Sequence, residues 1–498
     1  MQAKSVGLIW LTLLGLANAT QNQVKLLQLT RRLYWYSMHY PLSIHDLEVL
    51  KKIGDQIRAL QRPKSSWAVD PKERAEKMGP LSAWAGKHLR LEGFEFRKLP
   101  NGDFNMFATR ELPSNHVIAK GQLNYTLSLS DSKPMLRYCI KDERVQTMKG
   151  RYDDFWNNHM WVALRLIMER LNPNSFFRPY IDGLPYSFVH PVFFGPTEST
   201  LLTGSQVYPD SVWTAEEAYL QYAVIYEQLV ENEDNCQHLG LTPQLVTLDM
   251  YIWAFATVIT RVFQDPGGED MRLLPVRDMI NHKFGVEMDQ MSMTGSDADD
   301  SFTMTLRKPM RKGEEMFLEY KEDTLTVDKF FNTWGMVMKN TPSYITCKLF
   351  PVDPEYDRKR VALENNGFGL DASLAMSLKL SPLPISENDF NFLVAVATGT
   401  PTSELKGLIS ADDLDQTTWR QTWAFLQDQI EFQLDWYERS LKENLSFREK
   451  NKKTLSDNAK LALEYIVNEQ TMLETYLAKV KQIGDGPIVR FHKDKVEL

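Results

Sequence analysis

Two short segments combine side chains that could do chemistry. The first runs from Asp278 through Met279-Ile280 to Asn281 and His282, and the second is a later strand-like run that ends at Tyr320. An amide, an imidazole and a phenol can orient a polar reactant through hydrogen bonds. Each side chain also has a structural alternative: Asn281 as a turn residue, His282 as a core histidine, Tyr320 as a strand aromatic and Asp278 as a helix cap.

A β-rich region frames these segments. Residues Phe104 to Lys120 contain two strand-like runs separated by the turn composition Pro113-Ser114-Asn115, and another strand-like stretch surrounds Tyr125 to Leu129. Alternating apolar and polar side chains predict further strands from Phe302 to Leu306 and from Met316 to Tyr320.

Helical patterns occupy the rest of the chain. Residues 155–260 are predicted to be mainly helical, with a capping box at Thr214 to Glu217 and a helix start at Thr242-Pro243. Apolar residues recur at helical spacing from Trp419 to Leu441 and from Ala459 to Val480, and core packing explains both stripes most simply. The sequence therefore predicts an α+β protein, in which a helical insert interrupts a β-rich unit and helices follow.

Length and composition narrow the class of protein. The 498 residues suit two or three domains, and 43% hydrophobic and 24% charged residues are typical of a folded chain. The net charge of −8 gives no support to nucleic-acid binding. No spacing typical of metal ligands is evident, and the acidic run Asp297, Asp299 and Asp300 lacks the glycine and distal glutamate of an EF-hand. We expect a solvated loop there.

Both ends of the chain predict a location. Lys4, the apolar run Val6 to Leu16 and Ala17-Asn18-Ala19 have the layout of a secretory signal peptide over residues 1–19. No later segment is apolar for long enough to be a membrane helix. The tail Lys495-Val496-Glu497-Leu498 resembles the retrieval signal of the endoplasmic reticulum. We therefore expect residence in that lumen; secretion, or a plastid location suggested by the acid-free stretch at residues 20–44, is the alternative.

Cysteines and sequons do not decide the compartment. Cys139, Cys236 and Cys347 allow one disulfide and one thiol, or three buried thiols. The sequons Asn124-Tyr125-Thr126 and Asn444-Leu445-Ser446 are compatible with a lumen, but such tripeptides are frequent by chance.

An ordered set of segments resembles the Rubisco lysine methyltransferase-like branch of SET-domain proteins, a branch that also contains an actin-histidine methyltransferase. The resemblance runs from about Leu81 to Val480. Besides the two opening segments, it rests on Phe107 to Leu112, Trp161 to Leu164, Ser175 to Pro185, Thr260 to Phe263 and Leu455-Ser456.

The resemblance implies a fold and a site. It implies a SET domain over residues 81–345 with a helical insert at about 150–250. A helical N-terminal extension at 20–80, an all-α substrate-binding domain at 346–485 and a tail at 486–498 complete the chain. It implies S-adenosylmethionine as cofactor and a protein or peptide as substrate, with Tyr320 as the catalytic residue. The cofactor site would comprise Phe104, Asn105, Asn281, His282 and Tyr320, and the target side-chain pocket would comprise Arg261, Phe263, Asp278 and Trp334.

Two segments depart from the family pattern. Asp103-Phe104-Asn105 replaces a Gly-x-Gly whose glycines allow unusual dihedrals and close approach to the cofactor, and Trp334-Gly335-Met336 replaces Tyr-Gly-Phe. Asparagine tolerates the left-handed region, so the turn is expected to persist. The resemblance implies a protein-lysine methyltransferase, which we expect to be monomeric. A catalytically silent SET-like protein that binds a client, or a histidine methyltransferase, is the alternative.

Overall fold

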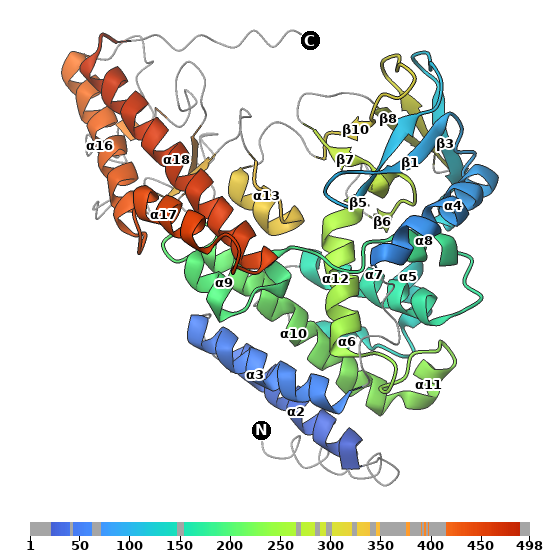
Figure 1. Ribbon diagram of the computed structural model, residues 1–498. Coiled ribbons are helices and arrows are strands. Elements are labelled where there is room, and N and C mark those ends of the chain that lie inside the picture. Colours follow the sequence, from blue (N-terminus) through green and yellow to red (C-terminus); the bar gives the residue numbers. More distant parts are fainter. Residues whose placement is uncertain are drawn as a thin grey trace, which may run out of the picture. The chain divides into compact units, whose positions relative to one another are not determined.

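The computed structural model comprises two units, each described by itself (Figure 1). Residues 1–188 and 212–321 form the first unit, and residues 189–211 and 322–498 form the second. The structure describes residues 21–39, 43–61, 71–146, 154–264, 270–283, 289–294, 301–320, 326–338, 345–348, 375–378, 390, 393–394, 397 and 415–488. The signal-like and retrieval-like ends and the acidic run at 297–300 lie outside these residues.

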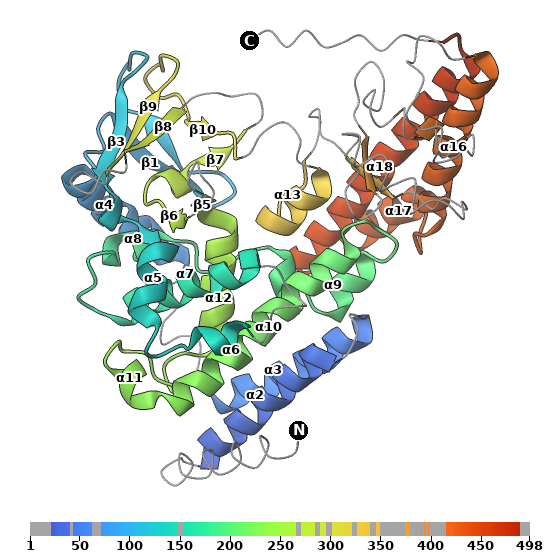
Figure 2. The ribbon, with the colours of Figure 1, turned by 180° about the vertical axis from the view of Figure 1, so that it is seen from behind.

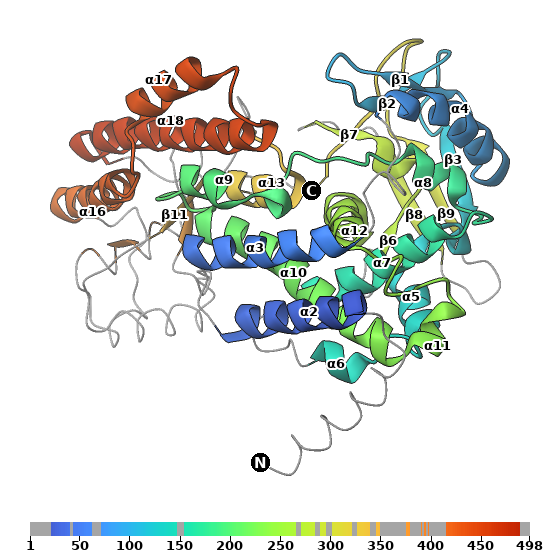
Figure 3. The same cartoon turned by 60° about the horizontal axis from the view of Figure 1, so that its bottom comes forward.

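Helices make up most of the first unit. They are α2 (Gln21–His39), α3 (Ile44–Leu60), α4 (Pro71–His88), α5 (Leu129–Leu136), α6 (Asp142–Gln146), α7 (Asp154–Leu171), α8 (Arg178–Gly183), α10 (Tyr208–Glu231), α11 (Glu233–Gln237) and α12 (Leu248–Arg261). Helices α2 and α3, in the predicted N-terminal extension, run side by side and bury Leu33 and Leu50 (Figure 3). The expected boundary at residue 80 falls inside the continuous helix α4.

The strands of the first unit are short. They are β1 (Phe94–Lys98), β2 (Phe104–Ala108), β3 (Val117–Gln122), β4 (Leu127–Ser128), β5 (Val262–Gln264), β6 (Met271–Leu273), β7 (Asn281–His282), β8 (Asp289–Thr294), β9 (Ser301–Leu306) and β10 (Phe317–Leu318). They pair as β1-β2, β10-β7, β3-β9-β8 and β4-β6-β5, and Figure 2 shows β3, β8 and β9 together. In β9, Phe302, Met304 and Leu306 are buried, as the alternation predicts. The run from Met316 to Tyr320 is strand only at its centre.

Two predicted helix starts are wrong. Thr214 lies inside α10, which already begins at Tyr208, so its hydroxyl does not cap a helix. Thr242 and Pro243 form a turn, in which the Thr242 carbonyl accepts from the amide of Leu245. The cap of α12 is Thr247, whose Oγ1 accepts from the Met250 amide at 3.2 Å. A hydroxyl before a helix-like pattern occurs at several positions here, and packing selects which of them begins the helix.

The second unit is helical with one strand pair. Its elements are α9 (Pro196–Leu201), α13 (Val327–Trp334), β11 (Ile345–Lys348), β12 (Ala375–Leu378), α16 (Gln416–Asp435), α17 (Leu441–Asn451) and α18 (Asp457–Asp485). The antiparallel pair β11-β12 corrects the all-α expectation. Helix α16 also stops before Leu441, because Ser440 and Glu443 form a capping box that begins α17. Trp419 and Trp423 of α16 pack into a core with α18.

One disulfide ties two surface segments of the first unit. Cys139 bonds Cys236 of α11, and Asn232 reinforces the contact by donating to the Cys139 carbonyl at 3.0 Å. Cys347 of the second unit is a buried free thiol. Of the alternatives left open by the sequence, the structure thus has one pair and one thiol. Over the described residues, no helix is both long and apolar enough to cross a membrane.

Candidate active site

The two chemical segments of the sequence are adjacent in the structure. Strands β7 and β10 pair in parallel, with Asn281 opposite Phe317 and His282 opposite Leu318. Beyond the strands, the Tyr320 amide donates to His282 Nδ1 at 3.0 Å, and the two rings lie 5.1 Å apart. The predicted combination of Asn281, His282 and Tyr320 is therefore one local structure.

Hydrogen bonds and burial fix the protonation of this pair. The Tyr320 hydroxyl donates to the Ile280 carbonyl at 2.8 Å, and burial raises its pKa to about 12, so it remains a phenol at neutral pH. Burial lowers the pKa of His282 to about 4, so the imidazole is neutral. Because Nδ1 accepts from Tyr320, the ring proton belongs on Nε2. Tyr320 can orient a reactant as a hydroxyl but cannot act as a base.

Hydrogen bonds of Asn105 connect β2 to the segments that carry Asn281 and Tyr320. Its side chain is fully buried; Nδ2 donates to Glu315 Oε1 at 2.7 Å and to the Met316 carbonyl at 2.9 Å, while Oδ1 accepts from the Asn281 amide at 3.2 Å. Its amide group is thus engaged inside the protein. The cofactor contact predicted for Asn105 remains a prediction.

The backbone of this turn differs from the expectation. The predicted left-handed conformation is not at Asn105 but at Gly102, where φ is +90°. A glycine one residue before the altered segment therefore supplies the conformational freedom, and strand β2 can begin at Phe104 with ordinary dihedrals.

Asp103 is neutralised by arginine. Arg74 of α4 pairs with Asp103 at 2.8 Å, donates to the Gly183 carbonyl at 2.8 Å and places its guanidinium 5.2 Å from the Phe104 ring. Burial raises the pKa of Asp103, but the charges of Arg261 and Arg74 outweigh burial and lower the pKa overall. No sequence pattern pointed to Arg74, because this residue lies in the predicted N-terminal extension and belongs to no motif.

Arg261 and Asp278, both predicted for the target side-chain pocket, are in contact, and their role in that pocket remains a prediction. Arg261 Nη1 donates to the Asp278 carbonyl, and the Tyr180 hydroxyl donates to the Asp278 carboxylate. Burial raises the pKa of Asp278 to about 6 against the opposing charge of Arg261. The helix-cap alternative for Asp278 is wrong, because Asp278 lies inside the 3₁₀ turn Arg277–Met279, whose first position is capped by no side chain. Tyr180 lies in the recognised segment Ser175 to Pro185, but its contact with Asp278 became apparent only from the structure.

Two atoms of this cluster lack a partner. Arg261 Nε and Asp278 Oδ1 are buried and make no hydrogen bond to any described residue. Since buried polar atoms are normally satisfied, this donor and this acceptor are available to a bound molecule or to water.

The other two predicted pocket residues lie in different units. Phe263 of β5 is half-buried beneath the guanidinium of Arg277, 4.2 Å away, in the first unit. Trp334 ends α13 in the second unit, 4.9 Å from Phe330. Gly335 follows with φ +65°, and a Cβ there would collide with the carbonyl of Val189. The predicted role of Trp334 in a target pocket remains a prediction.

These features define a class of protein. Short paired sheets, a helical insert between them, an Asn-His strand beside the strand that precedes a tyrosine, and a helical unit afterwards together make a split SET-domain fold. The predicted α+β class, with a helical insert in a β-rich domain, is confirmed, except that the strand pair β11-β12 lies in the part expected to be all-α.

Solved structures similar to this chain include those of the SET domain of LSMT and of Rubisco LSMT, in agreement with the resemblance seen in the sequence. The crystal structure of the SET domain of LSMT bound to lysine and AdoHcy superposes with a TM-score of 0.59 and 18% identity, over 82% of this chain and 91% of that chain. Rubisco LSMT bound to AdoMet gives a TM-score of 0.57 and 17% identity, over 82% and 92%.

Actin-histidine N-methyltransferases are similar in sequence over most of the chain. The Dasypus novemcinctus protein is 24% identical over 480 residues, which cover 90% of this chain and 78% of the relative. The Homo sapiens protein is 24% identical over 424 residues, which cover 81% and 68%. No protein-family model matches the chain.

Proposed function

We propose that this chain is an S-adenosylmethionine-dependent protein methyltransferase that methylates a lysine side chain. The observation that supports this most is that Asn281, His282 and Tyr320 lie together. Strands β7 and β10 pair, the Tyr320 amide donates to His282, and the Tyr320 hydroxyl donates to the Ile280 carbonyl. The neutral state of His282 and the protonated state of Tyr320 suit a site that positions reactants and does not abstract protons.

The cofactor would supply an activated methyl group on a sulfonium. The polar groups of the site fit such a molecule. The side-chain amide of the half-buried Asn281 can donate and accept hydrogen bonds, and Arg261 Nε can donate to a carboxylate. The Ile280 carbonyl and the Tyr320 hydroxyl present oxygen atoms to a cationic centre. Tyr320 would orient the attacking amine. The lysine must first lose its proton to solvent, because the phenol is not a base.

Cofactor binding and a tyrosine substitution test this function. Isothermal titration with S-adenosylmethionine should give heat, and Tyr320→Phe should keep binding while methyl transfer falls roughly 100-fold, as expected for loss of one positioned hydroxyl. Tyr138→Phe, a change at an exposed ring, is the matched control. Absence of both heat and a thermal shift would reject the enzyme. Client capture that persists without cofactor would instead favour the silent binding protein.

Histidine is the second candidate target, because the relatives similar in sequence are named for histidine methylation. Mass spectrometry of products from a lumenal lysate separates the two residues. A mark found on lysine supports the proposal, and a mark confined to histidine overturns its lysine part while the methyltransferase remains.

We further propose that the enzyme works in the lumen of the endoplasmic reticulum. The Cys139–Cys236 disulfide supports an oxidising compartment, in addition to the signal-like and retrieval-like ends of the sequence. Deletion of residues 495–498 should cause secretion of the protein. Retention of the truncated chain would show that the tail is not a retrieval signal.

A further inference from the structure

We propose that Asn124 carries an N-linked oligosaccharide and that Asn444, the other sequon asparagine, does not. The inference rests on the proposed lumenal location, because glycan transfer takes place there. In the transfer, Asn124 Nδ2 forms a bond to the sugar C1 of a lipid-diphosphate-linked oligosaccharide. The bond from C1 to the diphosphate oxygen breaks, and Nδ2 releases one proton.

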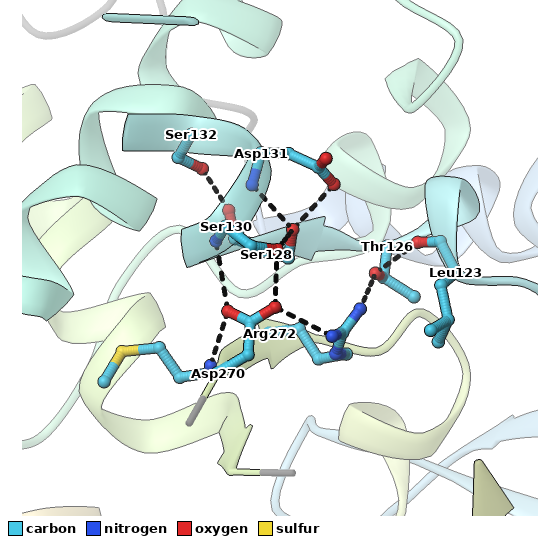
Figure 4. Close-up of polar contacts among 9 residues, drawn as sticks. Leu123, Thr126, Ser128, Ser130, Asp131, Ser132, Asp270 and Arg272 are labelled. Atoms are coloured by element: carbon cyan, nitrogen blue, oxygen red, sulfur yellow. Dashed lines mark hydrogen bonds and ion pairs between the residues drawn. The ribbon is translucent and has the colours of Figure 1, made fainter. Parts of the chain in front are cut away.

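Asn124 is exposed on a segment whose other residues are held. It lies in the 3₁₀ turn Leu123–Tyr125 between β3 and β4. Thr126, the third sequon residue, is buried; its hydroxyl donates to the Leu123 carbonyl at 2.6 Å and accepts from Arg272 at 3.3 Å (Figure 4). Arg272 is in turn paired with Asp270 at 2.8 Å. The network anchors the segment and leaves Asn124 at the surface.

Tyr125 anchors the same segment from its other side. Its ring lies 5.1 Å from the ring of Phe176 and 5.8 Å from that of His88, in a cluster that also contains Trp84. The other two sequon residues, Tyr125 and Thr126, therefore make contacts that a sugar on Asn124 leaves intact. A folded chain can carry an oligosaccharide at this position without loss of any described hydrogen bond.

Asn444 has the opposite environment. It is 3% exposed, and Nδ2 donates to the Gln470 side chain at 2.9 Å and to the Arg439 carbonyl at 3.3 Å, so both amide hydrogens are used. Helix α17 packs against α18 at this point. An oligosaccharide on Nδ2 would remove one of these bonds and require space where the helices meet. A chain modified there could not complete this packing.

The test uses the full chain expressed with both native ends in a cell with a secretory pathway. Endoglycosidase digestion should produce a single mobility step for the wild type and for Ser446→Ala, and no step for Asn124→Gln. Ser446→Ala is the suitable second variant, because Ser446 is exposed and the change destroys its sequon without touching the buried asparagine. Peptide mass spectrometry should find the deglycosylation mark at position 124.

Two results would overturn the inference: a wild-type chain without carbohydrate, or a step that survives Asn124→Gln and disappears with Ser446→Ala. N-terminal sequencing and protease protection of the same sample separate this failure from a failure of location. A cleaved signal with no sugar rejects the glycan alone. An uncleaved, unprotected chain rejects the lumen and the glycan together, while the methyltransferase activity is measured independently.

Discussion

Asn105→Ala should loosen the candidate active site from β2. The substitution removes three hydrogen bonds that join separate segments: those to Glu315 Oε1, the Met316 carbonyl and the Asn281 amide. One of them has a charged acceptor and contributes roughly 1.5–3 kcal/mol, and the neutral bonds contribute roughly 1 kcal/mol each. The loss is therefore at least about 3 kcal/mol, a large part of the roughly 5–15 kcal/mol typical of a folded domain.

Hydrogen exchange measured by mass spectrometry resolves this effect locally. Peptides that contain β7 or β10 should open roughly 100-fold more often in Asn105→Ala, which is what about 3 kcal/mol corresponds to. Asn101→Ala is the matched control: Asn101 is exposed and accepts one bond, from the Asp103 amide at 3.1 Å. It should change exchange less than tenfold.

Asn105→Asp sharpens the test. The introduced carboxylate keeps the acceptor bond to Asn281 but cannot donate, and it faces Glu315 across a former 2.7 Å contact. It should therefore destabilise the protein more than alanine at neutral pH. If the β7 and β10 peptides of both variants exchanged hydrogen at the wild-type rate, the bonds of Asn105 would not stabilise this site, and the reasoning would be refuted.

Two further predictions concern other buried groups. Replacing both Cys139 and Cys236 with serine should lower the free energy of unfolding by roughly 2–4 kcal/mol, because the disulfide closes a sequence separation of 97 residues. A reductant should lower the thermal midpoint of the wild type but not that of this variant. A Cys347→Ser variant, which keeps the disulfide, should respond to reductant like the wild type. In the second unit, burial lowers the pKa of His190 to about 4, and its Nδ1 accepts from the Val192 amide at 3.1 Å. The unfolded chain then binds the proton more readily, so this contribution to stability is complete above about pH 6.5 and is lost as pH falls towards 4. Denaturant midpoints between pH 7 and pH 5 should fall less for His190→Asn than for the wild type, and equal slopes would contradict the assignment.

Local patterns predicted much of the fold because they report local physics. The alternation in β9 and the stripe of α18 follow from one face of each element being buried, and both are observed. The end of α16 was missed because the apolar stripe continues through Tyr437 to Leu441, while the capping box at Ser440 ends its helical continuity. A stripe identifies which face is buried, but not whether one helix or two carry it.

The site was predictable only as far as its residues are close in sequence or belong to recognised segments. Arg261 and Asp278 were both predicted for the target side-chain pocket and lie in contact, whereas Tyr180 and Arg74 reach the same cluster from elements whose position depends on the whole first unit. Their contacts with Asp278 and Asp103 join segments that no period or spacing connects. Such hydrogen bonds and ion pairs between distant segments therefore become known only from the fold.

The altered turn shows why a departure from a motif need not abolish a site. Without side chains, glycines leave a turn free; here Asp103 and Asn105 are instead held by Arg74 and Glu315, while Gly102 retains the left-handed backbone. The Asp103 carboxylate is paired with the Arg74 guanidinium. Side-chain contacts therefore hold this turn where glycines would leave it flexible. Asn105 of the same segment still accepts a hydrogen bond from the backbone amide of Asn281 in the candidate site.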